Sequence, residues 1–269
     1  MPEPITTIGL GAIAAYLGKD GLEKLLGPTA DYLGGGLKDF TQKRMENIGQ
    51  ILKKADEKLG DKREQPGAIP PKVLKTIMND GSFNDDSLAV EYFGGVLASS
   101  RTELGRDDRG ARMAKLVDSL STYQLRTHYL IYSTIKETFQ DKGYLFNMDD
   151  RPKMEIFFPF WNYAQAMSFT SEELRSNDAF LRHIFFGLSN DGLIEANFLY
   201  GSAEHMKKKV PTANDGGIIC QPSALGAELF LWALGCGNHG LDYIFSKECQ
   251  PSVDGMPNVV AGTIAVKTT

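Results

Sequence analysis

Residues 178–234 read DAFLRHIFFGLSNDGLIEANFLYGSAEHMKKKVPTANDGGIICQPSALGAELFLWAL, and this stretch decides the fold of the C-terminal half. Apolar residues at helical spacing over 178–190 predict a helix. The polar turn that follows leads into a short apolar run at 192–195, which predicts a strand. The stretch therefore begins with a helix and a strand.

The second part of this stretch places a polar loop between two strands. The loop carries three consecutive lysines, Lys207, Lys208 and Lys209. A β-branched segment at 217–220 predicts the next strand, and an apolar pattern predicts a helix over 224–234. Helix, strand, basic loop, strand and helix in this order predict a winged-helix-like unit that contains a small β-hairpin or sheet.

The segments on either side of this unit are rich in aromatic and β-branched residues. Aromatic side chains crowd at 157–163 and again at 180–186. Such density is typical of a core or of a surface that contacts a partner. Trp161 is the aromatic candidate for partner contact. The β-branched run at 258–267 predicts a final strand.

Helical patterns dominate the N-terminal half, so the chain is expected to be mainly α (α+β). An apolar stripe predicts a helix over 37–59, and its members are Leu37, Phe40, Arg44, Ile48, Ile51, Leu52, Ala55 and Leu59. Further helices are expected over 71–79, from Asp85-Asp86-Ser87 to Ser100, over 109–119, and over 121–140 with Ser121 or Thr122 as its cap. His128, in the last of these, is expected to pack in the core or at an interface.

Polar stretches that contain glycine and proline divide the chain into three expected parts. Residues 1–68 hold an apolar segment and the long amphipathic helix. Residues 69–150 form a helical domain, and residues 151–269 form the aromatic-rich winged-helix-like region. The tail that begins at residue 236 receives no assignment from its sequence.

The composition of the 269 residues indicates a globular protein. The net charge of −5 argues against a protein whose main task is to coat nucleic acid. Three cysteines, an odd number placed late in the chain, favour the reducing cytoplasm. The apolar run at 5–17 is shorter than the roughly 20 residues of a membrane-spanning helix, so no membrane span is expected.

Two patterns approach cofactor or metal-binding motifs. Residues 9–14, GLGAIA, fit a variant of the dinucleotide fingerprint, but the surrounding pattern lacks the βαβ unit that such a site needs. The weak candidates for zinc are Cys220, Cys236, His239 and Cys249. Only Cys236 and His239 have the spacing of a ligand pair, and zinc sites normally bring two pairs. We therefore expect no cofactor and no metal, with the cysteines as buried structural residues.

Two groups of basic residues are candidates for contact with nucleic acid or another partner. Arg106 and Arg109 belong to a loop whose basic side chains are diluted by acidic ones. The lysines at 207–209 are undiluted and stand where a wing would reach phosphates. Given the negative charge of the chain, a solvated loop is the favoured interpretation, and phosphate contact is the alternative.

A set of short structural motifs runs through residues 25–235. The motifs are Gly27-Pro28 at a helix start, the charged helix 37–59, Ile69-Pro70-Pro71-Lys72-Val73-Leu74, Asp85-Asp86-Ser87-Leu88 with Phe93, Leu97 and Ala98, Leu116 with Leu120 and Ser121, Gly192-Leu193-Ile194, and Leu225-Gly226 with Phe230. Together they resemble the abortive-infection alpha family of bacterial phage-defence proteins. That family often has tryptophan where this chain has Tyr92 or Phe93. The resemblance implies a role in defence or growth arrest and transfers no catalytic residues.

These observations favour a component of anti-phage defence that acts by binding rather than by catalysis. We expect a protein partner or self-association, with nucleic acid as a weaker alternative. A winged-helix DNA-binding regulator that uses the lysine loop is the first alternative function. The second is an enzyme whose active site is assembled from residues distant in sequence, because such a site leaves no local motif.

Overall fold

The structure of the chain is a computed structural model that describes residues 36–266, with side chains from residue 42 onward. The chain divides into two compact units, Met1–Gln50 and Ile51–Thr269. Helix α3, Gly36–Leu59, runs across this division and confirms the long helix predicted at 37–59. The GLGAIA segment at 9–14 lies outside the described residues.

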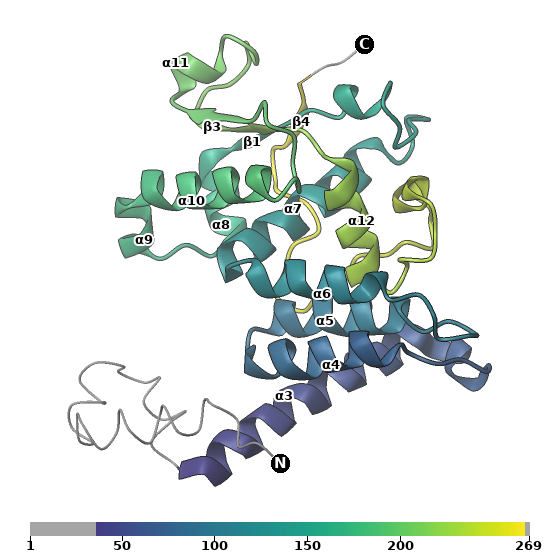
Figure 1. The fold of residues 1–269 in the computed structure, drawn as a ribbon. Coiled ribbons are helices and arrows are strands. Elements are labelled where there is room, and N and C mark those ends of the chain that lie inside the picture. Colours follow the sequence, from purple (N-terminus) through teal and green to yellow (C-terminus); the bar gives the residue numbers. More distant parts are fainter. Residues whose placement is uncertain (1–35, 267–269) are drawn as a thin grey trace. The chain divides into compact units, whose positions relative to one another are not determined.

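The second unit is built mainly from helices. They include α4 Pro71–Asp80, α5 Ser87–Ser99, α6 Arg109–Ser119, α7 Thr122–Phe139 and α12 Ala224–Ala233 (Figure 1). These bounds confirm the helices predicted in the same segments. Local caps explain the agreement: the Asp86 carboxylate accepts hydrogen bonds from the first N–H groups of α5, and Ser121 forms a capping box with Gln124 at the start of α7.

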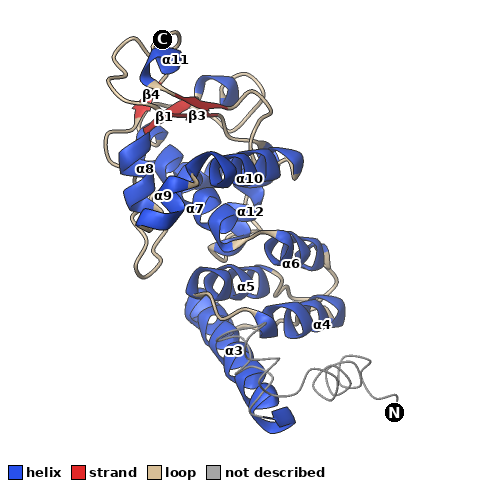
Figure 2. Cartoon of the chain, turned by 90° about the vertical axis from the view of Figure 1, so that its left-hand side faces the viewer, coloured by secondary structure: helices blue, strands red, loops and turns tan. Residues whose placement is uncertain are grey.

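Four short antiparallel strands form one sheet in the order β2-β3-β1-β4. Their bounds are β1 Ile156–Pro159, β2 Leu199–Gly201, β3 Gly217–Cys220 and β4 Ile264–Ala265. Three helices, α8 Phe160–Ala166, α9 Ser171–Arg175 and α10 Asn177–Asn190, lie between β1 and β2 in the chain. Figure 2 shows the strands at one end of this unit, close to α8 and α10.

The element order is that of a winged helix. Helix α7, strand β1, helices α8 to α10, strand β2, a loop at 202–216 and strand β3 follow one another, and β3 lies between β2 and β1 in the sheet. We call residues 202–216 the wing. The mainly α (α+β) fold with a winged-helix-like unit is thus confirmed.

The strands differ from their predicted positions. The strand predicted at 192–195 is wrong: within that segment only Ile194 forms an isolated bridge, with Pro222, and the strand begins at Leu199. Gly192, at φ 71°, reverses the chain so that Leu193 is buried next to the end of α10. The final strand is also shorter than the predicted run 258–267, since it comprises Ile264–Ala265 alone. Strand β1 is a strand that the aromatic density at 157–163 did not reveal.

Both faces of the sheet are covered, as the alternation of side chains along β1 and β3 requires. The side chains of Ile156, Phe158, Ile218 and Cys220 belong to the main core. Phe157 and Ile219 point to the other face, where they join Met206, Val210 and Ala213 of the wing. The wing therefore carries its own small apolar cluster and does not hang free of the sheet.

The apolar stripe of α3 is only partly correct. Ile51 and Ala55 are buried, and Leu59 packs against the core. Leu52 is 47% exposed, so its place in the predicted stripe is wrong, and Ile48 is half-buried. Leu52 follows Ile51 directly and therefore lies about 100° around the helix from it, on the solvent side.

Helix α7 is almost entirely buried and carries an unusual number of polar side chains. Their hydrogen bonds reach far along the chain: Thr127 to Tyr163 at 2.6 Å, Tyr129 to Asn258 at 2.7 Å, Tyr132 to the Leu193 carbonyl at 2.6 Å, and Lys136 to the Ser246 carbonyl at 3.2 Å. Buried polar groups need such partners, because an unsatisfied one costs about 1–3 kcal/mol. The helix is thus a polar spine within an apolar core.

Helices α5 and α12 touch through their backbones. A β-carbon placed on Gly95 would lie 1.8 Å from the Ala233 carbonyl oxygen, so only glycine fits at this position. The close approach joins the helices before residue 150 to those after it in one continuous core. Among the described residues, no helix combines the length and the apolar character needed to cross a membrane.

Candidate functional site

The wing lysines do not form a uniform basic tip. Lys209 Nζ lies 3.4 Å from Glu155 Oε1, and the Glu155 side chain is buried at the start of β1. Lys209 therefore ties the wing to the sheet. Lys207 and Lys208, just after helix α11, Ala203–Met206, are exposed. All three lysines are exposed, but Lys209 has Glu155 as an ion-pair partner, whereas Lys207 and Lys208 have none within the described residues.

Helix α10 presents a nearly neutral surface. Its exposed side includes Asp178, Arg182, His183 and Phe186. Arg182 pairs with Asp178 at 3.4 Å, and His183 Nε2 lies 2.9 Å from the Ser121 hydroxyl. This helix occupies the position that inserts into the major groove in winged-helix DNA-binding proteins, where cations normally contact phosphates. Its own charges are already paired.

A hollow of about 380 Å³ lies where α8, α10 and the ends of β2 and β3 meet. We call it the aromatic slot, and its lining residues are Phe160, Trp161, Asn177, Asp178, Leu181, Tyr200, Gly201, Gly216 and Gly217. Trp161 is 60% exposed, and its ring packs edge-on against Phe160 at 5.2 Å. Trp161 lies in this hollow together with two other aromatic rings, whereas Arg109 lines a separate hollow with Trp232 and His239.

Glycines shape the floor of the aromatic slot. The Phe160 N–H donates to the Gly216 carbonyl at 2.9 Å, which fixes the start of α8 against the end of the wing. Gly217 pairs with Pro159 in the sheet, and a β-carbon there would lie 2.3 Å from the Phe158 carbonyl oxygen. Strands β1 and β3 can approach this closely here only because position 217 has no side chain.

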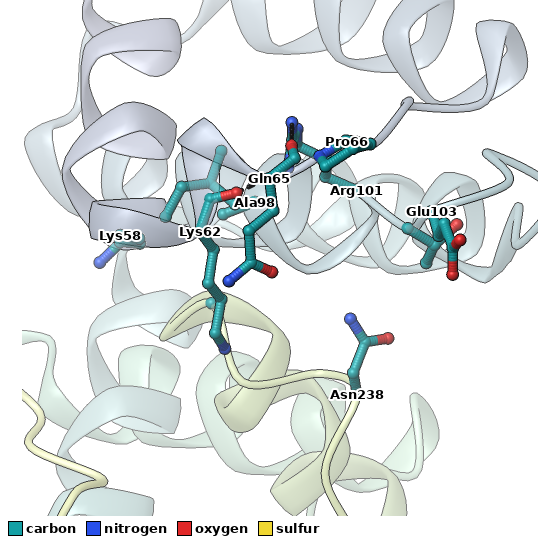
Figure 3. A pocket seen from close by; sticks show the side chains of 11 residues that line it. Lys58, Lys62, Gln65, Pro66, Ala98, Arg101, Glu103 and Asn238 are labelled. Atoms are coloured by element: carbon teal, nitrogen blue, oxygen red, sulfur yellow. Dashed lines mark hydrogen bonds between the residues drawn. The ribbon is translucent and has the colours of Figure 1, made fainter.

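A second hollow, of about 370 Å³, is polar and gathers residues that are distant in sequence (Figure 3). Its labelled side chains are Lys58, Lys62, Gln65, Pro66, Ala98, Arg101, Glu103 and Asn238, and Lys62 and Asn238 extend toward each other across it. The Arg101 guanidinium donates to the carbonyls of Lys62, Arg63 and Gln65 at 2.6–3.3 Å. Arg101 thus holds the 60–65 segment over the end of α5.

Two of the four charged side chains at this polar hollow, Lys58 and Arg101, are already used within the fold. Lys58 and Lys54 both pair with the buried Glu91, at 2.9 and 2.6 Å. Asn238 donates to the Ser99 carbonyl at 3.1 Å. The lining combines lysine, amide and carboxylate groups but, within the described residues, no nucleophile paired with a base. The hollow is therefore a weak candidate for an enzyme site built from distant residues.

The other basic candidates lie apart from both hollows. Arg106 is exposed in the loop before α6. Arg109 pairs with Asp107 at 2.6 Å, and its guanidinium lies 5.5 Å from the centre of the Trp232 ring, which is a cation–π contact. Arg109 thus covers the buried Trp232 and is committed to the fold.

The cysteines are free thiols. Cys220 is buried in β3, Cys249 is buried, and Cys236 is half-buried. Burial raises the pKa of Cys249 to about 12 and also raises the pKa values of Cys220 and Cys236, so these thiols stay protonated at neutral pH. The His239 ring stacks on Tyr243 at 3.8 Å. Over residues 42–266, no three His, Cys, Asp or Glu side chains are grouped closely enough to hold a metal ion.

Comparison of the chain with protein-family models, with curated proteins and with solved structures gives no match. The interpretation of the site therefore depends on its own geometry. That geometry singles out the aromatic slot, because it combines a hollow, an exposed tryptophan beside two further aromatic rings, and a carboxylate.

The sequence pointed to two residues of this slot, Trp161 and, within the aromatic run at 157–163, Phe160, and missed the others. Asp178 was expected only as the start of a helix, and Tyr200 was not singled out. The available signal was the placement of Gly201 and Gly216 at the two ends of the polar loop. Glycine at the end of a strand often marks a close approach of another segment or of a ligand.

Proposed function

We propose that this chain is a phage-defence protein of the abortive-infection type that acts by binding a protein partner through its winged-helix unit. The observation that carries the binding role is the exposed aromatic surface at the slot. Trp161 is 60% exposed there, and the half-buried Phe160 and Tyr200 line the same hollow. Large aromatic side chains beside a hollow are typical anchors of protein interfaces.

The defence setting rests on the sequence motifs that resemble the abortive-infection alpha family. Four of these seven motifs fall on α4, α5, α6 and α12, whose side chains contribute to the core. Motifs of this structural kind support a scaffold related to that of the abortive-infection alpha family, but they say little about whether the biochemical activity is shared. A protein with this scaffold and an exposed aromatic surface is suited to binding, which is why we propose binding rather than turnover.

Charge favours a protein over DNA as the partner. The exposed side of α10 offers one arginine, and Asp178 already pairs with it. Lys209 of the wing is committed to Glu155. DNA binding draws much of its affinity from cations that contact phosphates and release counterions. A chain with a net charge of −5 offers little of this, whereas aromatic anchors do not need it.

A phage challenge tests the proposal. Cells that express the wild-type chain, Trp161→Ala or Met148→Ala at equal levels are infected with a panel of phages, with the neighbouring genes present. We expect the wild type to restrict phage or halt infected cells, and Trp161→Ala to lose most of this protection. Met148 is 81% exposed and lies outside the slot, so Met148→Ala should protect like the wild type.

Two results of this experiment would count against the proposal. Absence of protection by the wild type across the panel would contradict the defence role. Full protection by Trp161→Ala would contradict the assignment of the aromatic slot as the binding surface.

A DNA-binding regulator is the second candidate function, favoured by Lys207 and Lys208 on the wing of a winged helix. Binding of duplex DNA is measured at several salt concentrations for the wild type and for the Lys207→Gln, Lys208→Gln double variant. If both lysines contact phosphates, the log–log salt slope should fall by roughly one per lysine in the variant. Tight binding with this slope change, together with full protection by Trp161→Ala, would favour the regulator.

A further inference from the structure

We infer that the aromatic slot recognises an arginine side chain of the protein partner. The inference rests on the proposed function, because it takes the partner to be a protein, and it adds the chemistry of the contact. Three features of the slot support it: the aromatic walls, the carboxylate at its mouth and the floor of glycine backbone.

The walls of the slot supply aromatic faces for a cation. Phe160, Trp161 and Tyr200 all line the hollow. Elsewhere in the chain the fold already uses such faces, for example where Lys142 Nζ lies 4.8 Å from the centre of the Phe139 ring. Among the cation–π contacts found within the described residues, none involves the three rings of the slot. A cation placed on such rings gains about 0.5–1 kcal/mol when exposed and about 2 kcal/mol when desolvated.

The mouth of the slot supplies a carboxylate that can change partners. Asp178 is 74% exposed in its side chain, and Arg182 contacts it through one nitrogen at 3.4 Å. Exposed pairs of this i,i+4 kind contribute only about 0.3–0.5 kcal/mol, so an incoming guanidinium with two parallel hydrogen bonds can replace Arg182. Burial and the negative charge of Asp178 raise the pKa of the Tyr200 hydroxyl, which is consistent with a carboxylate close to the rings.

The floor of the slot favours arginine over lysine. Gly201, Gly216 and Gly217 line the slot with backbone, against which a flat group can lie, although the β-carbon positions of Gly216 and Gly217 are filled by other atoms of the fold. The guanidinium is planar, stacks on aromatic rings and matches a carboxylate with a fork of donors, whereas the lysine ammonium is compact and strongly hydrated. A hollow of about 380 Å³ has room for the whole arginine side chain and part of the backbone that carries it.

Two positive groups oppose this binding, and they make the inference testable. The N-terminus of α10 carries a partial charge of about +0.5, and Arg182 carries a full one. Asp178, which lines the slot, acts against them. Since these charges nearly balance, the aromatic contacts supply most of the affinity, and removal of Arg182 should strengthen binding.

The test follows the indole signal of Trp161, which can be distinguished because the chain has two tryptophans. Only Trp161 and Trp232 are present, and Trp232 is fully buried, so the indole N–H of Trp161 can be followed separately by NMR. The ¹⁵N-labelled full chain is titrated with Gly/Ser nonapeptides that carry one central arginine, lysine, citrulline or glutamate. We expect a saturable shift of the Trp161 signal with arginine. Citrulline, a neutral analogue of the same shape, should bind about fivefold more weakly, which corresponds to roughly 1 kcal/mol.

Three variants and one matched control sharpen the test. Trp161→Ala, followed through the amide signals of Gly216 and Gly217, should abolish binding. Asp178→Asn should weaken the arginine peptide and leave citrulline unchanged. Arg182→Gln should tighten the arginine peptide. Phe186→Ala removes a comparably exposed aromatic ring of α10 outside the slot and should change nothing.

Equal binding of citrulline and arginine, stronger binding of the glutamate peptide, or weaker arginine binding by Arg182→Gln would each overturn the inference. Failure of the proposed function is seen separately. If the arginine peptide binds as expected but cells show no Trp161-dependent protection, the slot chemistry stands and the defence role falls. If protection depends on Trp161 but arginine has no advantage over citrulline, only the arginine assignment falls.

Discussion

The Tyr92 hydroxyl donates a hydrogen bond to Nδ1 of His128 at 2.8 Å, in the centre of the core between α5 and α7. The opposite nitrogen, Nε2, lies 3.0 Å from the Gly226 carbonyl, which can only accept. Nε2 therefore carries the proton, and the neutral imidazole joins three helices. His128 is fully buried, which confirms its predicted place in the core.

This arrangement predicts that stability depends on pH through His128. Burial lowers the pKa of His128 to about 3, whereas the unfolded side chain titrates near 6.5. The histidine contribution is therefore fully present above pH 6.5 and is lost as the pH falls toward 3, by up to about 1.4 kcal/mol per pH unit. Denaturant unfolding of the wild type and of His128→Gln between pH 7 and 5 measures this slope.

His128→Gln should be less stable than the wild type at pH 7 but should show a flatter dependence over this range. The range lies above the titration of most carboxylates, so it isolates histidines. Parallel pH dependences of the two proteins would mean that His128 is not neutral and buried.

Glu91 should be a larger contributor to stability than its exposed neighbour Glu57. Burial alone would raise the Glu91 pKa, but hydrogen bonds and charge from Lys54 and Lys58 outweigh it and hold that pKa low. Glu91→Gln breaks both pairs and should cost on the order of 1–3 kcal/mol in the free energy of unfolding, less than a fully buried pair because both lysines reach solvent. The matched change Glu57→Gln should cost under about 0.5 kcal/mol.

The Glu91 contribution has its own pH range. Because the folded pKa is lowered, the contribution is present above about pH 4.5 and is lost as the pH falls through the folded pKa. Equal unfolding midpoints for the two glutamate variants at neutral pH would disprove the role assigned to Glu91.

Lys209 should matter for the attachment of the wing, whereas its neighbour Lys208 should not. Lys209→Gln leaves the buried Glu155 without its lysine partner and is expected to lower the free energy of unfolding by about 1–2 kcal/mol. Lys208→Gln changes an exposed side chain and should stay within about 0.5 kcal/mol of the wild type. Hydrogen exchange of the wing amides provides a second readout, which should rise only in Lys209→Gln. Comparable effects of the two changes would argue against the anchor.

Two glycines in helices should respond in opposite ways to alanine. Gly95→Ala forces α5 and α12 apart and should destabilise the chain by about 3 kcal/mol or more. Gly49 in α3 has open space around its β-carbon position, so Gly49→Ala should be neutral or stabilise by up to about 1 kcal/mol through helix propensity. Thermal unfolding of both variants tests this. An unchanged melting temperature for Gly95→Ala would show that α5 and α12 can move apart with little loss of stability.

The helices could be predicted because their signals are local. The cap at Asp86 and the capping box at Ser121 mark helix starts within a few residues of the chain. Part of the winged-helix unit was also accessible, since helix α10 and the strand at 217–220 carry clear patterns. These features depend on neighbours in sequence and so survive without knowledge of the fold.

The errors occurred where tertiary contacts decide. Leu193 and Ile194 have a strand-like composition, but both side chains are buried in the core immediately after α10. Strand β2 forms later in the chain, from less apolar residues. The aromatic slot was out of reach for the same reason, because Asp178 and Tyr200 meet Trp161 only when the sheet brings β1 and β2 to opposite sides of β3. Hydrophobic periodicity carries no information on which distant residues form tertiary contacts.

The polar spine of α7 determines which register this helix adopts against the rest of the core. An apolar helix can shift by one turn and still bury its side chains, because hydrophobic contacts between side chains of similar size can replace one another. If α7 shifted by one turn, four buried polar side chains would lose their hydrogen-bond partners, which come from four different segments. These side chains are Thr127, His128, Tyr132 and Lys136. At about 1–3 kcal/mol for each stranded group, the total approaches the 5–15 kcal/mol that separates folded from unfolded domains. A mis-registered α7 would thus be hardly better than no fold, so hydrogen bonds rather than packing make the native register unique.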